Sequence, residues 1–257
     1  MPESRVAIVT GASAGIGAAF AVAVANRGYD VLLVARTADA LETVAERARS
    51  HGVRAQAVVA DLGDPSAVDI VAAAADAFGG SVKLLVNNAG FGLHGPFETL
   101  DAERQRAMIR LNVEALVAMT QRFAPAMLAT GRGAIVNVAS TAAFQPVPYM
   151  AVYGATKAFV LSFSEAIAEE YRTRGVRVLA LCPGATETNF FTIAGDAASA
   201  ALGKRRSVGD VVTTALRALD DGKTVVVDGA ANRALANAPR LFPRGVIARI
   251  AGRMMRP

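Results

Sequence analysis

Short runs of apolar, often β-branched residues alternate along the chain with longer stretches whose composition favours helices. Strands that are apolar on both faces and are separated by helices are typical of a parallel sheet covered on both sides. The pattern therefore predicts an α/β fold with a doubly wound, mostly parallel, seven-stranded sheet. The predicted strands are Val6–Thr10, Val31–Ala35, Ala55–Val59, Leu84–Asn87, Ala134–Val138, Val176–Leu181 and Thr224–Val227, and the clearest helices between them are Ile16–Arg27, Ala38–Ser50, Pro65–Phe78 and Tyr153–Arg174.

The 257 residues suit a single large domain, because no linker, repeat or low-complexity segment interrupts residues 1–228. Residues 229–257 differ from this body in charge, since they hold six of the 27 lysines and arginines and no acidic residue. The formal net charge of +5 thus arises in a C-terminal extension, and the body is close to neutral. A nucleic-acid-binding body would carry basic patches of its own, so the charge pattern argues against that class of protein.

Composition excludes several other classes. Hydrophobic residues make up 53% of the chain, but no uninterrupted run is long enough to span a bilayer. The first ten residues contain one short apolar run that suits a buried strand better than a signal peptide, so we expect a cytoplasmic protein. A single cysteine, Cys182, excludes an intrachain disulfide, and two histidines leave no cluster with the spacing of a metal site.

A glycine-rich turn follows the first predicted strand. Gly11, Ser13, Gly15, Ile16 and Gly17 lie between that strand and an apolar helix. Glycines let a backbone approach a pyrophosphate closely, and the start of the following helix presents free N–H groups and a positive dipole end. The turn is therefore a candidate phosphate site, although a simple tight turn explains the same glycines equally well.

Polar residues follow two further strands at the same expected edge of the sheet. Asp61 and Leu62 come after the third strand, and Asn88, Ala89 and Gly90 come after the fourth. Open α/β sheets bind ligands at this edge. Taken singly, however, aspartate, asparagine and glycine are also ordinary turn residues.

Tyr153 and Lys157 lie one turn apart on the same face of a predicted helix. A tyrosine needs its pKa lowered by about three units to exchange a proton near neutrality, which corresponds to roughly 4 kcal/mol. An ammonium at about 4 Å supplies a similar Coulomb energy at an effective dielectric constant of about 20. The pair therefore suits acid–base chemistry, and the plain alternative is a solvated helix face.

Taken together, four motifs resemble the short-chain dehydrogenases/reductases. They are Thr-Gly-x-x-x-Gly-x-Gly at residues 10–17, Asn-Asn-Ala-Gly at 87–90, Tyr-x-x-x-Lys at 153–157 and Pro-Gly-Ala-Thr-Glu-Thr at 183–188, in the order and spacing of that family. The resemblance runs from Thr10 to about Asp228. It implies a Rossmann fold, a nicotinamide cofactor, and a homodimer or homotetramer built on the helix that starts near Tyr153.

The resemblance also implies roles for single residues. Ser140 would hydrogen-bond the substrate oxygen, and Tyr153 would be the general acid for reduction. Lys157 would lower the pKa of Tyr153 and hold the nicotinamide ribose, while Asn112 would anchor a water that links Lys157 to solvent. The cofactor would contact Gly11, Ser13, Gly15, Ile16, Gly17, Arg36, Thr37, Asp61, Leu62, Asn88, Ala89, Gly90, Tyr153, Lys157, Pro183, Gly184, Thr186 and Thr188.

The end of the second strand indicates which cofactor binds. Family members that prefer NAD(H) carry an aspartate at the place of Ala35, and here Arg36 and Thr37 follow that position instead. A cation matches the ribose phosphate of NADP(H), so we expect NADP(H). Arg36 could also be an ordinary surface charge.

Apolar residues near the motifs predict the substrate. The stretch of about 189–206 has neither a strand nor a helix pattern and resembles a substrate lid. We therefore expect a small carbonyl or alcohol substrate with an apolar body, such as a ketone, aldehyde, 3-oxoacyl compound or steroid. The alternative is a non-catalytic NADP(H)-binding sensor or scaffold. The residues concerned are Phe190, Phe191 and Ile193 in the lid and Phe91, Leu93, Phe144, Val147 and Met150 elsewhere, any of which could equally be core; His94 suits a loop residue better than a catalyst.

The C-terminal extension has the pattern of an amphipathic basic helix. Apolar residues recur every fourth position, and arginines fall on another face. We expect the helix to dock on protein, and the alternative is peripheral contact with an anionic membrane; the helix is too short to cross one. The apolar positions are Phe242, Val246, Ile250 and Met254, and the basic ones are Arg249, Arg253 and Arg256.

Overall fold

A computed structural model describes residues 4–195 and 205–256, and its centre is one seven-stranded sheet. The described strands are all parallel and follow the spatial order β3-β2-β1-β4-β5-β6-β7. This confirms the predicted doubly wound sheet. The strands are β1 (Arg5–Thr10), β2 (Asp30–Ala35), β3 (Ala55–Val59), β4 (Ser81–Asn87), β5 (Gly133–Val138), β6 (Val176–Cys182) and β7 (Val225–Val227).

The strand order reverses between β1 and β4, which are neighbours although two strands separate them in the chain. Connections from β1 run outward to β2 and β3, and those from β4 run outward to β5, β6 and β7. The crevice at such a reversal, beyond the carboxyl ends of the strands, is where open α/β sheets bind ligands. The turns after Thr10 and Asn87 both open into it.

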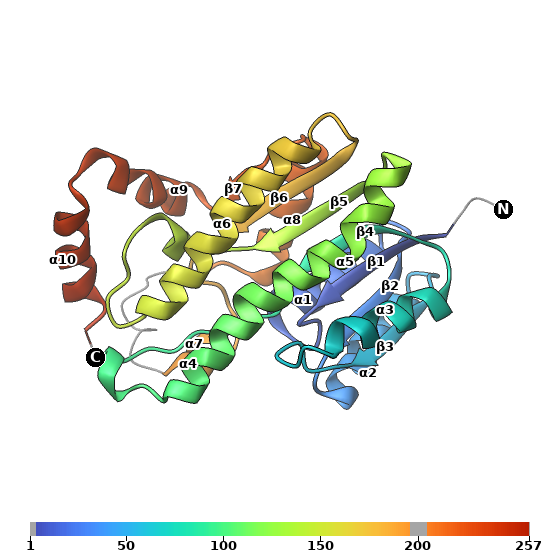
Figure 1. Ribbon diagram of the computed structural model, residues 1–257, viewed down its shortest axis with the longest axis horizontal. Coiled ribbons are helices and arrows are strands. Elements are labelled where there is room, and N and C mark those ends of the chain that lie inside the picture. The colour runs from blue at the N-terminus through green and yellow to red at the C-terminus, as the bar shows by residue number, and fades with distance from the viewer. Residues whose placement is uncertain (1–3, 196–204, 257) are drawn as a thin grey trace.

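Helices cover both faces of the sheet (Figure 1). One face packs against α1, α2 and α8, and the other packs against α3, α5 and α6. The helices are α1 (Gly15–Ala25), α2 (Ala38–Arg49), α3 (Ala67–Phe78), α4 (Ala102–Ile109), α5 (Ala115–Thr130), α6 (Ala151–Tyr171), α7 (Phe190–Ala194), α8 (Val208–Asp220), α9 (Ala230–Asn237) and α10 (Arg244–Met254).

Successive residues of β1 show why apolar runs without alternation become central strands. Ala7 and Val9 lie in the core on the α1 side, and Val6 and Ile8 lie in the core on the α3 side. All four are at most 1% exposed. Both faces of a central parallel strand exclude water, so polar alternation is absent from its sequence.

A buried chain of polar side chains ties α6 to the sheet. Asn87 on β4 pairs in register with Asn137 on β5, and its Nδ2 donates to Asn137 Oδ1 at 2.9 Å. Asn137 Nδ2 in turn donates to Ser164 Oγ on α6 at 2.9 Å. Hydrogen bonds between buried side chains are directional, so they fix a helix against a sheet more specifically than apolar packing does. The register of α6, and with it the position of Tyr153, is set in part by these bonds.

The C-terminal extension lies beyond the carboxyl ends of the strands, where α9 and α10 stand at the edge of the body (Figure 1). His94 Nε2 lies 2.7 Å from the backbone oxygen of Met255. Arg256 Nε donates to the Tyr149 hydroxyl at 3.4 Å. The described tail therefore docks on its own subunit, as the sequence favoured. Among the described residues no helix is both long and apolar enough to cross a membrane.

Candidate active site

The turn between β1 and α1 packs too tightly for side chains. Gly11 and Gly15 have φ of +63° and +56°, the left-handed region that favours glycine. A Cβ on Gly17 would lie 2.2 Å from the carbonyl oxygen of Gly11. Because α1 begins at Gly15, its first N–H groups and the positive end of its dipole lie at this turn. The turn can hold a phosphate group against the backbone.

Thr10 and Asn88 fasten this turn to the end of the neighbouring strand. Thr10 Oγ1 accepts the backbone N–H groups of Asn88 at 2.9 Å and Ala89 at 3.0 Å. Asn88 Nδ2 donates to the backbone oxygens of Thr10 at 2.9 Å and Gly11 at 3.2 Å. The glycine turn after β1 and the Asn88–Gly90 segment after β4, which were predicted separately from the sequence, are thus joined by hydrogen bonds into one surface of the site.

Ser140 and Tyr153 meet at the carboxyl end of β5. Ser140 follows that strand, and its Oγ accepts the N–H of Ala142 at 3.1 Å at the start of a short turn. Tyr153 lies in the first turn of α6, is 8% exposed, and lines the same cavity as Ser140. Phe190 of α7 covers the phenol ring, with ring centres 5.1 Å apart. A hydroxyl pair is therefore held in a sheltered position.

Burial shifts the pKa values of Tyr153 and Lys157 in opposite directions. It raises the pKa of the Tyr153 phenol to about 12, although the hydrogen bond with Ser140 acts in the opposite direction. Burial also lowers the pKa of the Lys157 ammonium to about 8. Lys157 Nζ donates to the backbone oxygen of Val138 at 2.7 Å and lies 5.8 Å from the centre of the Tyr153 ring. The sequence predicted the opposite direction for the pKa of Tyr153, because a Coulomb estimate leaves out the cost of burying a phenolate.

Asn112 lies behind the cleft on a widened turn of helix, Arg110–Glu114. Its Oδ1 accepts the N–H of Phe91 at 3.1 Å, and its Nδ2 donates to the backbone oxygen of Phe91 at 3.0 Å and to Thr156 Oγ1 at 3.1 Å. A Cβ on Gly90 would lie 2.7 Å from Asn112 Oδ1. Asn112 therefore fixes the loop after β4 against α6, and its role as a water anchor stays a prediction.

The loop after β6, residues 183–188, closes over the glycine turn. A Cβ on Gly15 would lie 3.0 Å from Thr188 Cγ2. On its other side Gly184 contacts α9, since a Cβ there would lie 2.3 Å from Asn232 Nδ2. The loop thus sits between the glycine turn and the C-terminal extension.

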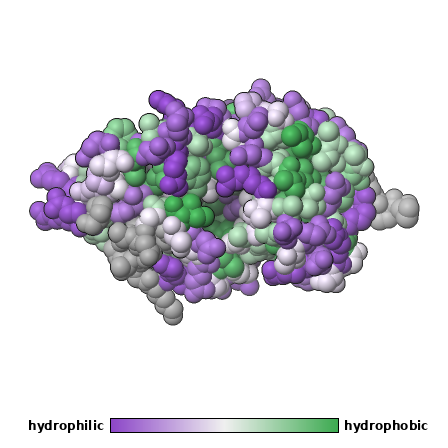
Figure 2. Space-filling model, turned by 90° about the horizontal axis from the view of Figure 1, so that it is seen from below, coloured by the Kyte–Doolittle hydropathy of each residue, from purple (hydrophilic) through white to green (hydrophobic). Residues whose placement is uncertain are grey.

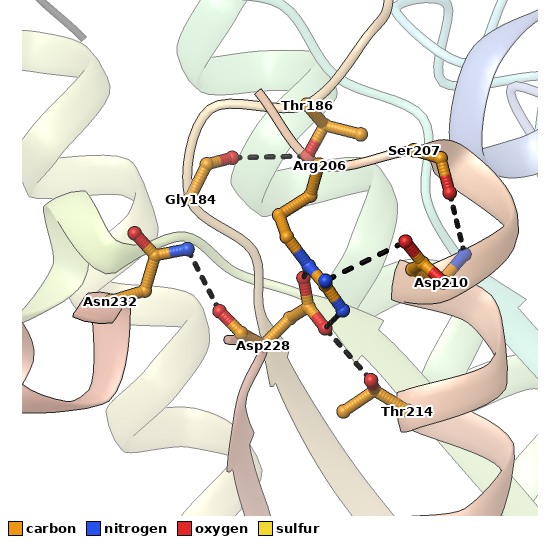
Figure 3. Close-up of polar contacts among 8 residues, drawn as sticks. All are labelled: Gly184, Thr186, Arg206, Ser207, Asp210, Thr214, Asp228 and Asn232. Atoms are coloured by element: carbon orange, nitrogen blue, oxygen red, sulfur yellow. Dashed lines mark hydrogen bonds and ion pairs between the residues drawn. The ribbon is translucent and has the colours of Figure 1, made fainter. Parts of the chain in front are cut away.

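Arg206 ties that loop to the end of β7 (Figure 3). Its backbone N–H donates to Ala185 O at 2.9 Å, and its carbonyl accepts from Glu187 N at 2.9 Å. Its guanidinium forms two bonds to Asp228, Nε to Oδ2 at 3.0 Å and NH2 to Oδ1 at 3.2 Å. Asp228 is 0% exposed and also accepts from Thr214 Oγ1 at 2.7 Å. A buried carboxylate therefore anchors one wall of the site.

These segments surround a cavity of about 930 Å³. Figure 2 shows a hollow in the face seen from below, with apolar surface on part of its border and hydrophilic surface on the rest. The cavity brings together nearly all of the residues predicted from the motifs. They are Gly11, Ser13, Gly15, Ile16, Arg36, Thr37, Asp61, Leu62, Asn88, Ala89, Gly90, Ser140, Tyr153, Lys157, Pro183, Gly184, Thr186 and Thr188.

Comparison with known proteins assigns this arrangement to a family. Residues 5–198 match the short chain dehydrogenase family. The chain belongs to that family. The very-long-chain 3-oxoacyl-CoA reductase of Anas platyrhynchos is 35% identical over 183 residues, which are 69% of this chain and 58% of that relative.

Solved structures agree with this assignment. A short-chain dehydrogenase from Sphingobium yanoikuyae in complex with NADPH has a TM-score of 0.82 and 35% identity, with 95% of each chain covered. The bulky-bulky ketone specific alcohol dehydrogenase from Comamonas testosteroni has a TM-score of 0.78 and 31% identity, covering 95% of this chain and 93% of that one. The protein is thus an oxidoreductase of the short-chain dehydrogenase/reductase type with the Rossmann fold.

Not every predicted residue of this short-chain dehydrogenase lines the cavity. Gly17 and Asn112 do not line the cavity and instead support it from behind. Leu93 and Phe144 are packing residues: Leu93 is 4% exposed in a cluster with Met150, and Phe144 packs against another core cluster.

The apolar residues that do line the cavity are Phe91, Val147, Met150, Phe190 and Ile193. Part of the predicted lid forms the short helix α7, which corrects the expectation of an irregular segment. Residues 196–204 of the predicted lid lie outside the described residues, and so does the Phe191 side chain.

Sequence reasoning missed a whole wall of the cavity. Residues of the C-terminal extension line it, although the extension was interpreted as an addition to the catalytic body. Their apolar spacing was the available signal, but it did not show which surface the stripe faces. The missed lining residues include Leu235, Ala236, Phe242, Val246, Ile247, Ile250, Ala251, Met254 and Met255, together with Arg104, Ala107 and Leu111.

Metal ligation finds no support in the part of the chain that the structure describes, where no three histidine, cysteine or acidic side chains gather. The thiol of Cys182 is buried behind Ser140, and burial raises its pKa to about 12. It is therefore a packing group rather than a nucleophile.

Proposed function

We propose that the protein is an NADP(H)-dependent oxidoreductase that interconverts a carbonyl and an alcohol on a largely apolar substrate. The observation that carries this proposal is that Ser140 and Tyr153 line the same cavity as the glycine turn. Many of the other side chains that line that cavity are apolar, among them Phe91, Met150 and Phe190.

The residues present suit a nicotinamide dinucleotide. Gly11 and Gly15 carry no side chain where the glycine turn lines the cavity, so the backbone there can approach a phosphate group closely. Asp61, Leu62 and Lys157 line the same cavity. In this proposal Asp61 and Leu62 border the adenine, and Lys157 holds the nicotinamide ribose. The cofactor, when bound, supplies or accepts the hydride.

In reduction, Tyr153 donates its proton to the carbonyl oxygen as charge develops there. Because burial raises the pKa of Tyr153 to about 12, the phenol keeps that proton at neutral pH. The Ser140 hydroxyl holds the substrate oxygen beside it. Phe190 lies against the phenol ring and keeps water away from this face.

The test of this function is reduction of ketones and aldehydes graded by chain length and ring number, followed as NADPH oxidation. Turnover that rises with the apolar size of the substrate supports the proposal. NADPH binding without turnover on any member of the panel would favour the sensor or scaffold instead.

Arg36 is expected to set the cofactor preference. Its side chain lines the cavity, and in the described part of the chain it forms no salt bridge. A charge-assisted hydrogen bond contributes roughly 1.5–3 kcal/mol, so NADPH should bind at least about tenfold more tightly than NADH. Fluorescence titration of both cofactors with wild-type and Arg36→Ala protein measures this. Arg36→Ala should remove most of the preference, and equal affinities in wild type would contradict it.

A homodimer or homotetramer through α6 is also proposed. Phe159 on this helix is 41% exposed and stacks on Phe163 with ring centres 5.8 Å apart. Light scattering after size exclusion should show an oligomer for wild type and smaller species for Phe159→Glu. Ile70→Glu on α3, where the residue is 48% exposed, is the matched control and should not change the mass. A monomeric wild type would refute the interface.

A further inference from the structure

One face of α10 belongs to the catalytic cavity. Val246, Ile250 and Met254 lie at every fourth position of the helix, and all three line the cavity that also contains Tyr153. Ile250 is 51% exposed and Met254 is 56% exposed, so these apolar side chains meet solvent inside the hollow rather than other core residues. Apolar surface exposed in a concave site gains free energy when a ligand covers it.

The basic face of α10 points to a different place. Arg249, Arg253 and Arg256 border a separate groove beside Pro148 and Tyr149. These arginines do not line the catalytic cavity. The helix thus separates an apolar surface, which faces the cleft, from a charged surface, which faces outward.

Specific contacts hold the helix in this orientation. Ile247 and Ala251 are buried on the side toward the body. His94 Nε2 and the Met255 backbone oxygen lie 2.7 Å apart. Tyr149, whose hydroxyl accepts from Arg256, has a φ of 63°, a strained conformation for a residue with a side chain. These contacts fix α10 on the body of the protein, so that its apolar face lines the cavity in a defined orientation.

We infer that the apolar face of α10 is the part of the active site that recognises the end of the substrate remote from its carbonyl. This inference rests on the proposed function and narrows it to carbonyl compounds with an elongated apolar body. Ile250 and Met254 are then specificity-determining residues. The carbonyl end of the substrate lies at Ser140 and Tyr153. The contacts of α10 therefore determine which lengths of substrate bind well, and they do not take part in the proton transfer.

Steady-state kinetics with two methyl ketones test the inference. Because a remote contact contributes to binding in ground and transition states alike, Ile250→Ala should raise KM for methyl nonyl ketone by about tenfold and leave kcat within about twofold. Butanone lacks the long apolar body that the inference assigns to α10, so its kcat/KM should stay unchanged. Arg253→Ala, on the outer face of the same helix, is the matched control and should resemble wild type with both ketones. Equal losses of Ile250→Ala toward both ketones, or no loss toward either, would overturn the inference.

Binding of Nile red, a neutral apolar dye, separates this inference from the proposed function. Weaker dye binding by Ile250→Ala but not by Arg253→Ala supports the apolar wall even if wild type reduces no ketone, in which case only the proposed function fails. Unchanged dye binding in Ile250→Ala would contradict the inference that the apolar face of α10 binds an apolar ligand. Ile250 is half exposed, so the variant should fold, and a thermal unfolding midpoint near that of wild type verifies this.

Sedimentation with anionic liposomes tests the competing occupant, a membrane surface. If the apolar face of α10 faces the cleft, it is not available to lipid, and the wild-type protein should not sediment with the liposomes. Salt-sensitive pelleting that Ile250→Ala abolishes would show that the same side chains insert into lipid, and it would overturn the inference.

Discussion

Replacing Tyr153 by phenylalanine is expected to lower the turnover number for ketone reduction by about 10²- to 10⁴-fold, the usual contribution of general acid–base catalysis. The substitution removes the proton donor and keeps the ring. The ring contact with Phe190 and the packing of α6 should survive, because neither uses the hydroxyl. Stopped-flow or steady-state measurement of NADPH oxidation with a good substrate gives the ratio.

Two measurements make this expectation specific. NADPH affinity should change little in Tyr153→Phe, since the residues proposed to hold the phosphates and the adenine are those of the glycine turn and of the ends of β2 and β3. Glu170→Gln, a change at an exposed position of the same helix outside the cavity, serves as the control for an effect of substitution in α6. If Tyr153→Phe kept near-normal turnover, the assignment of the acid would be wrong.

The strands and the catalytic motifs could be predicted because each carries a local signal. β1 is buried on both faces, so an unbroken apolar run marks it in the sequence. Gly11, Gly15 and Gly17 are required by backbone conformation or by close approach, and no other residue replaces glycine there without strain. The motif spacing then brings Tyr153 and Ser140 to the cleft.

The α10 wall could not be predicted for a different reason. A stripe at every fourth position records that one face of a helix is apolar, but core, lipid and a ligand cavity all select the same stripe. Only the tertiary position of α10 shows that Ile250 and Met254 face the catalytic cleft. Phe144 and Leu93 illustrate the converse, because loop residues near the site turned into the core.

The direction of the pKa of Tyr153 also depends on tertiary structure. A sequence gives the spacing of Tyr153 and Lys157, and spacing gives a Coulomb attraction. Burial of both groups is a larger effect in the folded protein, and it opposes charge on either one. The amount of burial follows from Phe190 and the surrounding cavity, which come from distant parts of the chain.

Removing the Arg206 side chain is expected to destabilise the fold by about 2–3 kcal/mol. Loss of one partner of a fully buried ion pair costs about 3–5 kcal/mol, because it leaves an uncompensated buried charge. Asp228 is 0% exposed, but the Arg206 side chain is 40% exposed, so water reaches the pair and reduces the cost. Urea unfolding of wild type and Arg206→Ala measures the difference in the free energy of unfolding.

Matched variants separate the buried bond from surface charge. Arg206 NH1 also lies 3.5 Å from Asp210, which is 56% exposed, and Asp210→Asn should cost less than about 1 kcal/mol because exposed pairs contribute little. Adding Asp228→Asn to Arg206→Ala should restore part of the lost free energy of unfolding, because the asparagine amide is uncharged and leaves no unpaired charge in the interior. Arg206→Ala should also bind NADPH more weakly, because the lost side-chain bonds to Asp228 hold residue 206 in place, and its backbone bonds Ala185 and Glu187 in the loop that closes over the glycine turn. If Arg206→Ala and Asp210→Asn had the same free energy of unfolding, the ion pair with Asp228 would not be needed to hold the loop of residues 183–188 in place.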